Sequence, residues 1–550
     1  MCGIFGLLYS NMDDLDIKNI DKHFMKGLKR GPEYSVLKNY TTNNVMLGFH
    51  RLAINGLNTI SNQPIEFQNY SLICNGEIYN HSELAEKFSA NLKTDSDCEI
   101  ISYGYSVIGT HIFNMLDGVF SCIIIDKINN SIIVARDPYG VRPLYLCEYT
   151  NKNIGLASDI SPLLFDKIEN IKQFEPGTYS IFKYINGYFE LTLQERYFFN
   201  YSLLNQLEPN HKPITHYMYH FVELLKQSIY KRVQNCEREV ACLLSGGLDS
   251  SLISAFVSRF YYEKTGNIVE TYSIGLEGSE DLKYTTLVSN HIKSLHRNII
   301  KTNEDFINSI PNVIQHVETY DTTTIRASTG NWNIGKYIKE NSNAKVIFNG
   351  DGADELMGGY LYFKLAPNNY EFDKECKNLL SQIRYFDVLR SDKSISSHGL
   401  EPRTPFLDKE LTKYYLSIPI EYRNHNNENN CEKYFIRKAI ETFEPTLLPK
   451  EVLWRKKEAF SDGVSSQEKS WYEIIQDFID KRQDINNNLH KNNYLFNPPS
   501  SKEQLYYRQL FEIYFPNINS DIIPHFWMPK YVKNANDASA RTLDIYDSDK

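Results

Sequence analysis

The sequence has no C-x-x-C pair, no apolar run long enough for a membrane-spanning helix and no excess of basic residues. Its nine cysteines are scattered between Cys2 and Cys431, which argues against a disulfide framework and against a structural zinc site. The first residues lack the basic region and the cleavage site of a signal peptide, so we expect a cytoplasmic protein without a membrane partner. A net charge of −9 likewise gives no general attraction for nucleic acid, and any anionic ligand must be bound by local groups.

The composition is that of a globular protein. The chain has 550 residues, of which 42% are hydrophobic and 23% charged, and this length allows two to four domains. Up to about residue 195 the pattern predicts short strands in GIFGLL, VMLGFHRLAI and YSLICNGEIYN, and a hairpin in SCIIIDKINNSIIVARD. We therefore predict an α+β domain over residues 1–200.

A second domain of a different class is predicted after a connector at residues 201–214, where strand patterning stops and Pro, Asn and His accumulate. REVACLL, VETYSIGL and AKVIFNG are predicted as strands, and VELLKQSIYKRV, SSLISAFVSRFYYEKTG, EKYFIRKAIETF and SKEQLYYRQLFEIYF as helices. Strand, helix and strand in succession are typical of a parallel sheet, so residues 215–530 are predicted as an α/β domain. Residues 531–550 are polar, and we expect a mobile tail there.

The first stretch that can carry chemistry is MCGIFGLL at the N-terminus. Once Met1 is removed, Cys2 has a free α-amino group beside its thiol. An α-amino group with an ordinary pKa of about 7.7–8.0 can accept the proton of a thiol at neutral pH, which makes the thiolate nucleophile. Taken alone, Cys2 is equally compatible with a buried small side chain at the start of an edge strand.

The second stretch, CLLSGGLDSS, joins a predicted buried strand to the start of a predicted helix. Gly246 and Gly247 allow backbone N–H groups to approach a ligand, Ser245 and Ser250 can donate hydroxyl groups, and a helix N-terminus favours phosphate. The stretch lacks the lysine of G-x-x-x-x-G-K-[ST] and is not G-x-G-x-x-G. Asp249 would repel phosphate unless a divalent cation lies between them, so the loop implies Mg²⁺. SGG alone would also suit an ordinary strand-to-helix turn.

The third stretch, VIFNGDGADELMGGY, places Asp351, Asp354 and Glu355 directly after an apolar strand. Ligands of open α/β sheets bind at the carboxyl ends of the strands. Carboxylates at that edge can bind Mg²⁺ or act as a base, although an acidic turn in solvent has the same composition.

Together these stretches resemble the glutamine-hydrolysing asparagine synthetases, in order and at compatible spacing, from Met1 to about residue 530. The resemblance implies that residues 1–200 form a class II glutamine amidotransferase domain with the αββα sandwich of N-terminal-nucleophile hydrolases. In that family the cysteine after the removed methionine attacks the glutamine amide, a role that falls to Cys2. RGPEYS, at Arg30 and Gly31, is similar to the family's Arg-Gly-Pro loop, with Lys29 where a histidine often precedes it.

The resemblance also assigns the residues that bind glutamine. They are Arg51 for the α-carboxylate, Asn75 and Gly76 for the oxyanion, and Glu77 and Asp97 for the α-ammonium and amide groups. Oppositely charged side chains would thus meet the two charged groups of this zwitterion. Taken singly, Arg51 and Asp97 would more often be surface charges than ligands.

For residues 215–530 the resemblance implies a doubly wound α/β ATP-pyrophosphatase domain. Asp249 and Asp354 correspond to the Mg²⁺ ligands, and Lys457 to the lysine that contacts the leaving pyrophosphate. The residues implied for ATP are Leu243, Ser245, Gly246, Gly247, Asp249, Ser250, Ile274, Gly350 and Asp351. The residues implied for aspartate are Thr323, Thr324 and Arg326, in ETYDTTTIRAST, together with Glu355. A threonine run on its own is more typical of a strand than of a ligand site.

One position departs from the family. Many members carry Glu where Asp351 stands, and that Glu is assigned the proton transfer when ammonia attacks the activated aspartate. Asp351 is one methylene shorter, so it would need a closer backbone or a bridging water to act as the base.

The resulting hypothesis is an ATP-dependent ligase with two sites, in which Cys2 forms a glutamyl thioester and the released ammonia converts β-aspartyl-AMP to asparagine, AMP and pyrophosphate. Its small-molecule partners are glutamine, aspartate and ATP. Three alternatives stay open: an amide or lactam synthetase for another carboxylate, a glutaminase with an inert second half, and an amino-acid-sensing homologue without turnover. The sequence leaves the oligomeric state open, a homodimer among the states that it allows.

Overall fold

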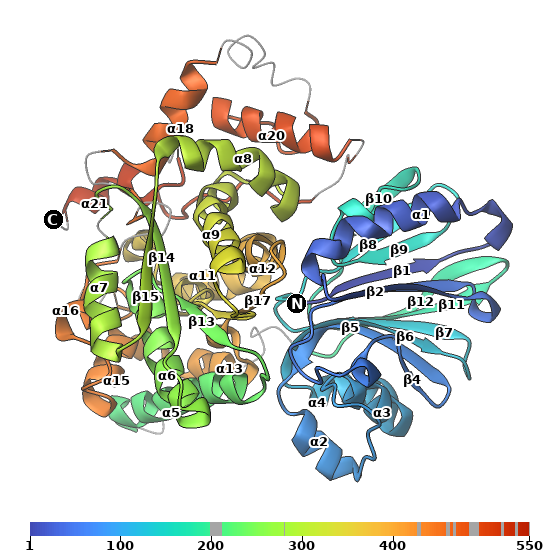
Figure 1. The fold of residues 1–550 in the computed structure, drawn as a ribbon. Helices are drawn as coiled ribbons and strands as arrows, with labels where there is room; N and C mark the ends of the chain where they lie inside the picture. Colours follow the sequence, from blue (N-terminus) through green and yellow to red (C-terminus); the bar gives the residue numbers. More distant parts are fainter. Residues whose placement is uncertain are drawn as a thin grey trace.

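Two antiparallel sheets of six strands form the N-terminal half of the protein in the computed structural model (Figure 1). The structure describes residues 1–198, 212–279, 281–425, 431–457, 463–465, 469–482, 494–516, 518, 522–533 and 537–548. The first sheet has the order β10-β8-β9-β1-β3-β2 and the second the order β12-β11-β7-β6-β5-β4. The strands are β1 Gly3–Leu8, β2 Tyr34–Tyr40, β3 Val45–Arg51, β4 Ile65–Phe67, β5 Tyr70–Ile78, β6 Gly118–Asp126, β7 Ser131–Arg136, β8 Tyr145–Tyr149, β9 Ile154–Ala157, β10 Ile168–Gln173, β11 Thr178–Ile185 and β12 Tyr188–Arg196.

Helices cover the outer faces of these two sheets. Apolar side chains from both sheets, including Ile4, Phe49 and Ile123, pack into one core between them. The helix α1 (Ile17–Phe24) lies on the first sheet, and α2 (His81–Phe88), α3 (Glu99–Ile108) and α4 (Ile112–Met115) lie on the second. The predicted αββα sandwich is thereby confirmed, because alternate residues of each strand face the inner core and the helices.

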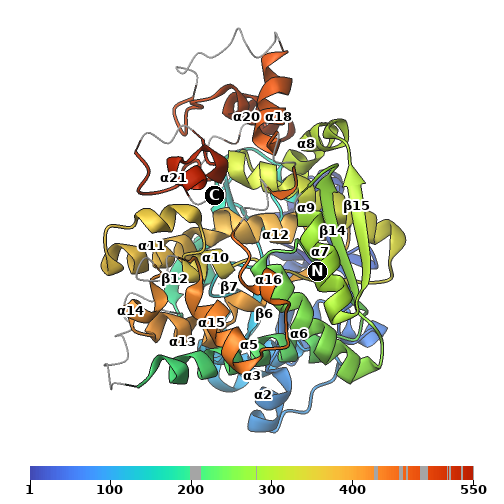
Figure 2. The same ribbon diagram turned by 90° about the vertical axis from the view of Figure 1, so that its left-hand side faces the viewer.

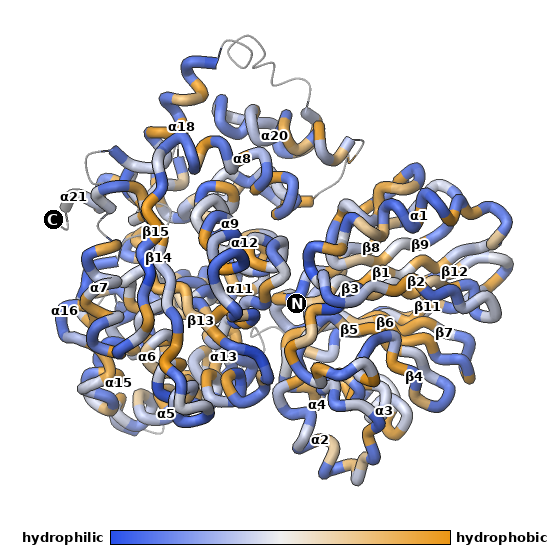
Figure 3. The backbone as a smooth tube through the Cα atoms, viewed as in Figure 1, coloured by the Kyte–Doolittle hydropathy of each residue, from blue (hydrophilic) through white to orange (hydrophobic). Residues whose placement is uncertain are grey.

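The hairpin predicted from SCIIIDKINNSIIVARD is also confirmed. It is formed by β6 and β7, which pair from Ser121 with Arg136 to Asp126 with Ser131. The strands β6 and β7 are hydrophobic along most of their length (Figure 3). They are buried on both faces, which explains their nearly continuous apolar sequence.

A parallel sheet of five strands forms the centre of the C-terminal half, in the order β15-β14-β13-β16-β17. Its strands are β13 Val240–Leu243, β14 Glu270–Leu276, β15 Leu295–Lys301, β16 Val346–Phe348 and β17 Glu401–Arg403. Val240 and Cys242 pack into one core and Ala241 into another, as expected when alternate side chains face opposite sides of the sheet. The predicted doubly wound α/β fold is confirmed, with strand order reversing at β13.

The helices of this half divide between the two faces of the sheet, and Figure 2 shows β14 and β15 at the opposite side from α11 and α14. They are α5 Ile214–Gln234, α6 Leu248–Thr265, α7 Asp281–Ile292, α8 Asn303–Val317, α9 Thr322–Asn341, α10 Ala353–Met357, α11 Asn369–Gln382, α12 Asp387–Ser396, α13 Lys409–Ser417, α14 Ile420–Arg423, α15 Tyr434–Phe443, α16 Lys450–Leu453, α18 Trp471–Asp480, α20 Lys502–Tyr514 and α21 Asp544–Ser548. None of the described helices combines the length and hydropathy that crossing a membrane requires.

Two predicted segments need separate comment. Most of the predicted connector at 201–214 lies outside the described residues, and α5 begins at Ile214. The expected mobile tail differs from prediction in its described part, because residues 537–548 contain α21 and pack onto the second half. Leu543 is buried against Tyr362 and Phe363, and the Asp537 carboxylate is held by a guanidinium group. A few anchoring side chains in a polar segment are enough to order it.

Buried ion pairs join the two halves. Arg30 lies 2.8 Å from Asp392, and Arg403 lies 3.2 Å from Glu77. The paired side chains are at most 5% exposed, so each charge depends on its partner across the interface. The two halves therefore meet at the Cys2 end of the first sheet, which brings the predicted glutamine site next to the parallel sheet.

Candidate active sites

Cys2 directly precedes β1, at the interface of the two halves. Its backbone nitrogen donates to Asn75 Oδ1 at 3.1 Å, and its thiol lies 3.6 Å from the carbonyl oxygen of Leu52. Burial raises the pKa of the thiol, which needs a base to become a nucleophile. If Met1 is removed, the nitrogen bound by Asn75 is an α-amino group, and Asn75 would then orient this predicted base beside the sulfur.

Asn75 and Gly76 lie on β5 and have the properties of an oxyanion site. The side-chain nitrogen Nδ2 of Asn75 is buried and has no hydrogen-bond partner among the described residues. A buried donor without a partner is costly, which is consistent with a ligand oxygen binding there. A Cβ atom at Gly76 would lie 2.3 Å from the carbonyl oxygen of Val119, so only glycine fits next to this donor.

Arg51, at the end of β3, lies close to Cys2 but is engaged by the loop that follows it. Its guanidinium donates to the carbonyl oxygen of Asn58 at 2.8 Å, to Asn62 Oδ1 at 2.7 Å and to the carbonyl oxygen of Gly56. These neutral acceptors are weaker partners for a guanidinium than a carboxylate. The predicted α-carboxylate of glutamine could therefore replace some of them.

Glu77 and Asp97 supply the negative charge of this site. Glu77 accepts from Asn55 Nδ2 at 2.6 Å and pairs with Arg403, while Asp97 accepts from the backbone N–H of Ile78 at 2.6 Å. Burial raises the pKa of both carboxyl groups, and repulsion from Glu401 raises both pKa values further. Asp97 also raises the pKa of Glu77 by repulsion. An ammonium group bound between them would relieve this repulsion.

The second site is a cavity of about 200 Å³ at the carboxyl ends of β13, β14 and β16. Residues 245–250 follow β13 and form a short loop and the first turn of α6, with a hydrogen bond from the backbone N–H of Ser245 to Ser250 Oγ at 3.1 Å. They pack closely on the loop after β16, because a Cβ atom at Gly350 would lie 2.9 Å from Asp249 and Ser250. The two motifs singled out in the sequence thus share one wall.

Most residues that the sequence assigned to ATP and aspartate line this cavity. Gly246 and Arg326 are not among its lining residues. Those that line it are Leu243, Ser245, Gly247, Asp249, Ser250, Ile274, Thr323, Thr324, Gly350, Asp351, Asp354, Glu355 and Lys457. Gly246 has a φ of +73°, and a Cβ atom at this position would lie 2.6 Å from Tyr284. It therefore determines the backbone conformation of the loop without lining the cavity.

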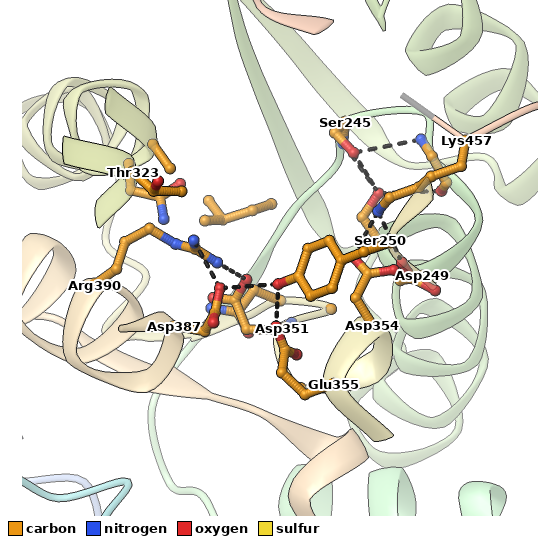
Figure 4. A pocket seen from close by; sticks show the side chains of 18 of the residues that line it. Ser245, Asp249, Ser250, Thr323, Asp351, Asp354, Glu355, Asp387, Arg390 and Lys457 are labelled. Atoms are coloured by element: carbon orange, nitrogen blue, oxygen red, sulfur yellow. Dashed lines mark hydrogen bonds and ion pairs between the residues drawn. The ribbon is translucent and has the colours of Figure 1, made fainter. Parts of the chain in front are cut away.

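Two lysines lie between the carboxylates of Asp249 and Asp354. Lys433 Nζ is 2.5 Å from Asp249 and 2.6 Å from Asp354, and Lys457 Nζ is 2.6 Å from Asp354 (Figure 4 shows Asp249, Asp354 and Lys457). Burial alone would raise the pKa of Asp354, but the two ammonium groups outweigh it and hold that pKa well below its usual range. The Asp354 carboxylate is therefore ionised at neutral pH.

This donor set fits a Mg²⁺ ion that arrives with phosphate groups. The described residues contain no group of three or more His, Cys, Asp and Glu side chains that could hold a metal by themselves. Two carboxylates on one wall leave the remaining positions of an octahedral ion to phosphate oxygens and water, as Mg²⁺ prefers. Asp249 and Asp354 would be its protein ligands.

Asp351 belongs to a second charged cluster that lines the same cavity. Arg390 Nη2 lies 3.1 Å from Asp351 Oδ1, and Arg390 Nη1 lies 2.8 Å from Asp387 (Figure 4). The other oxygen of Asp351, Oδ2, is buried and makes no hydrogen bond to the described residues. The Tyr360 hydroxyl donates to Glu355, for which burial and the nearby Asp387 raise the pKa. Arg390 thus holds one oxygen of Asp351 and leaves the other without a hydrogen-bond partner among the described residues.

Arg326 is the predicted aspartate ligand that the structure places elsewhere. Its guanidinium is buried and fully engaged, with Glu503 at 2.6 Å and Asp537 at 2.7 Å. These ion pairs connect α9 to α20 and to the described part of the C-terminal segment. They stabilise the position of α9, whose first turn contains Thr323. The guanidinium that does face the cavity is that of Arg390.

Sequence reasoning missed Lys433, Arg390, Asp387 and Tyr360. Lys433 has a left-handed backbone with φ +55°, which is uncommon outside glycine, and its buried ammonium group lies behind the cavity wall between Asp249 and Asp354. Tyr360 is the last residue of the stretch VIFNGDGADELMGGY. Asp387 and Arg390 lie on α12 and Lys433 is the N-cap of α15, with no motif around them. Only the packing of α12 and α15 against the β16 loop shows that they belong to the site.

Comparison with known proteins matches both halves. The glutamine amidotransferase domain family matches residues 1–212, and the asparagine synthase family matches residues 220–374 and 365–521. The asparagine synthetase [glutamine-hydrolyzing] of Gallus gallus is 39% identical over 572 residues, covering 100% of this chain and 99% of that protein. Those of Rattus norvegicus and Homo sapiens are 38% identical over 577 and 579 residues, with the same coverage.

Proposed function

The chain belongs to the glutamine-hydrolysing asparagine synthetases, and on that premise we propose that it makes L-asparagine from L-aspartate, glutamine and ATP. The observation that carries the proposal is the pair of sites in one chain. One has a cysteine beside an unpartnered buried amide donor, and the other has carboxylates and lysines around a cavity at the strand ends.

The first half-reaction is amide hydrolysis at Cys2. The sulfur attacks the side-chain carbonyl of glutamine, and its proton passes to the α-amino group that Asn75 orients once Met1 is removed. Asn75 Nδ2 donates to the oxyanion of the tetrahedral intermediate, a contact made only as charge develops. The C–N bond breaks with return of the proton to the leaving nitrogen, which gives ammonia and a thioester, and water then releases glutamate.

Arg51, Glu77 and Asp97 bind the end of glutamine that does not react. Arg51 pairs with the α-carboxylate in exchange for neutral acceptors of its loop. The ammonium group restores the ionised form of the Glu77 and Asp97 carboxyl groups, whose pKa is raised by burial. The ammonia must then reach the second site unprotonated, and the buried interface between the halves is the route that avoids bulk water.

The second half-reaction is activation of aspartate in the cavity. The β-carboxylate attacks the α-phosphorus of ATP, which forms β-aspartyl-AMP and releases pyrophosphate. Lys433 and Lys457 neutralise charge on the leaving pyrophosphate, and Mg²⁺ held by Asp249 and Asp354 would supply further charge neutralisation. Thr323, whose hydroxyl is buried without a partner, and Thr324 line the wall where aspartate binds.

Asp351 completes the reaction as the base. Ammonia attacks the activated carbonyl, Asp351 Oδ2 accepts a proton from the new nitrogen, and AMP leaves. The shorter side chain is offset by its setting, because Arg390 fixes one oxygen and leaves the buried Oδ2 without a hydrogen-bond partner among the described residues. Arg390 is therefore a positioning residue for Asp351.

The proposed function is tested by incubating the purified protein with Mg-ATP, aspartate and amide-¹⁵N glutamine. We expect labelled asparagine, AMP and pyrophosphate in equal amounts. Glutamate without asparagine would leave a glutaminase with an inert second half. Pyrophosphate release with another carboxylate but not with aspartate would identify a different amide synthetase.

Replacing Asp351 with asparagine should separate activation from amide formation. We expect ammonia-dependent asparagine synthesis to fall by about 10²-fold or more, the usual contribution of a general base, while pyrophosphate release persists. Pyrophosphate and asparagine are measured in the same reaction. Equal loss of both products would show instead that Asp351 acts in ATP binding.

The same variant should also lose part of the pH dependence. Burial raises the pKa of Asp351, so the carboxyl group binds a proton at a higher pH than an exposed aspartate does, and the base is lost as the pH falls through that raised value. At a constant concentration of unprotonated ammonia, the unmodified rate should decline on the acid side and the Asp351→Asn rate should not. Parallel profiles for the two proteins would contradict the assignment.

A further inference from the structure

Residues 235–238 connect α5 to β13 and belong to the synthetase half, yet they contact the glutamine site. We name this segment the interdomain clamp. Asn235 Nδ2 lies 3.3 Å from Glu77 Oε2, and the two following charged residues contact the turn at residues 53–56. That turn follows Leu52, whose carbonyl oxygen faces the Cys2 thiol. The proposed function does not use the clamp.

Every contact of the clamp with the turn involves the backbone of the turn. Arg238 Nε donates to the carbonyl oxygen of Ala53 at 2.7 Å, and the backbone N–H of Glu237 donates to the carbonyl oxygen of Ile54 at 3.1 Å. The backbone N–H of Gly56 donates to Glu237 Oε1 at 2.9 Å. Two of these bonds involve a charged side chain, which makes them stronger than bonds between neutral groups.

A third charged group completes the arrangement from the glutaminase half. Glu33 Oε2 accepts from the backbone N–H of Ala53 at 2.7 Å, while Glu33 Oε1 lies 2.6 Å from Arg238 Nη2. Arg238 and Glu33 therefore bind the backbone carbonyl oxygen and the backbone N–H of Ala53, respectively, and form an ion pair with each other. Their side chains are about a third exposed, at 28% and 31%, so these bonds can be removed without opening the core.

The opposite side of the same turn binds Arg51. The guanidinium donates to the carbonyl oxygens of Gly56 and Asn55, the latter at 3.4 Å. Gly56 has φ +58°, and a Cβ atom there would lie 2.5 Å from Ser61 Oγ. The turn is thus held between Arg51 and the clamp in one backbone conformation.

We propose that the interdomain clamp is part of the glutamine site, with Glu237 and Arg238 as positioning residues that preorganise the 53–56 turn for glutamine binding. The inference deepens the proposed function and rests on it for the identity of the substrate. The clamp suits this role because α5 and the central strand β13 anchor it on both sides. Without it, the turn and Arg51 must be ordered when glutamine binds, and that entropy cost weakens binding.

The test is a comparison of kinetic constants for Glu237→Gln, Arg238→Met and the double variant in the full-length protein. We expect the KM for glutamine to rise about three- to tenfold for each single variant, less than the loss of a fully buried charge-assisted hydrogen bond because these side chains are partly exposed. The kcat at saturating glutamine should stay within about twofold, and the KM values for ATP and aspartate in ammonia-dependent synthesis should not change. Arg238→Lys should recover part of the loss, because it keeps one charged donor.

Arg259→Met is the matched control. Arg259 is similarly exposed, at 37%, and pairs with Glu444 at 3.1 Å within the synthetase half. It should leave the KM for glutamine unchanged. An unchanged KM in the Arg238 and Glu237 variants, or an equal rise in the KM for glutamine, ATP and aspartate, would overturn the proposal.

Glutamate release is measured separately from asparagine, which distinguishes the two hypotheses. If the unmodified protein hydrolyses glutamine but makes no asparagine, the proposed function fails and the clamp is still tested through the KM for glutamate release. If asparagine forms and the clamp variants behave like Arg259→Met, only the clamp fails.

Discussion

The Cys2→Ala variant should lose glutamine-dependent asparagine synthesis and glutamate release by at least about 10³-fold, the scale of removing a nucleophile. It should keep ammonia-dependent synthesis, because Cys2 lies in the glutaminase half and the ATP cavity lies at the carboxyl ends of β13, β14 and β16. Alanine leaves the bond between the backbone nitrogen and Asn75 intact, so the loss reports the sulfur itself. The measurement is asparagine formation with glutamine and with ammonium chloride, at saturating Mg-ATP and aspartate.

Cys2→Ser and Asn75→Asp refine this experiment. Serine keeps a hydroxyl group of nearly the same size but a far weaker nucleophile, so it should behave like alanine. Asn75→Asp keeps an acceptor for the Cys2 nitrogen and removes the Nδ2 donor, so it should lower glutamate release by about 10²-fold. Retained glutaminase activity in Cys2→Ala would place the nucleophile elsewhere and remove the basis of the first half-reaction.

The second large effect is expected for Asp354→Asn. This carboxylate lies 2.6 Å from both Lys433 and Lys457, so the change leaves two buried ammonium groups beside Asp249 alone. We expect asparagine synthesis from either nitrogen source to fall by at least about 10²-fold, and pyrophosphate release to fall with it. Glutamate release should persist, because Asp354 has no contact with the Cys2 site. Asparagine and pyrophosphate are measured in the same reaction, as for Asp351→Asn, and glutamate release is measured separately.

A control separates catalysis from folding for this variant. Asp305→Asn removes a carboxylate from the exposed capping box of α8, outside the cavity, and should leave synthesis unchanged. Thermal unfolding of Asp354→Asn shows whether the two lysines destabilise the protein. Pyrophosphate release at the unmodified rate would mean that Asp354 has no part in holding Mg-ATP and that the two lysines serve the fold alone.

Local patterns in the sequence predicted the fold because they are unusually clear. The hairpin of β6 and β7, the buried strand before SGGLDSS and the helix after it all follow from apolar periodicity and turn residues. The threonine run fails as a local pattern, since Thr322, Thr323 and Thr324 begin the helix α9 with Asp321 as its N-cap. The cap and the packing of the helix outweigh the strand preference of β-branched residues.

The candidate site was predicted in part, for a comparable reason. Residues on a strand end or in the loop after it, such as Asn75, Asp249 and Asp351, are brought together by the topology of a sheet, which the order of elements already implies. Arg326 sits within a recognisable run, but its direction depends on Glu503 and Asp537, far away in the chain. A motif therefore predicts which segments of the chain form the site, but it does not predict the direction of each side chain.

By itself, the sequence determined the two domain classes and singled out Cys2, the SGGLDSS loop and the carboxylates that follow β16 as candidate site residues, since each depends on residues close together in the chain. Only the tertiary structure decided that Lys433 lies between Asp249 and Asp354, that Arg390 holds Asp351, and that Arg238 reaches the turn behind Cys2. These contacts join residues 39 to 185 positions apart. The physical reason is that a buried charge needs a partner of opposite sign nearby in space. No local sequence pattern encodes which residues will be near each other in the folded protein.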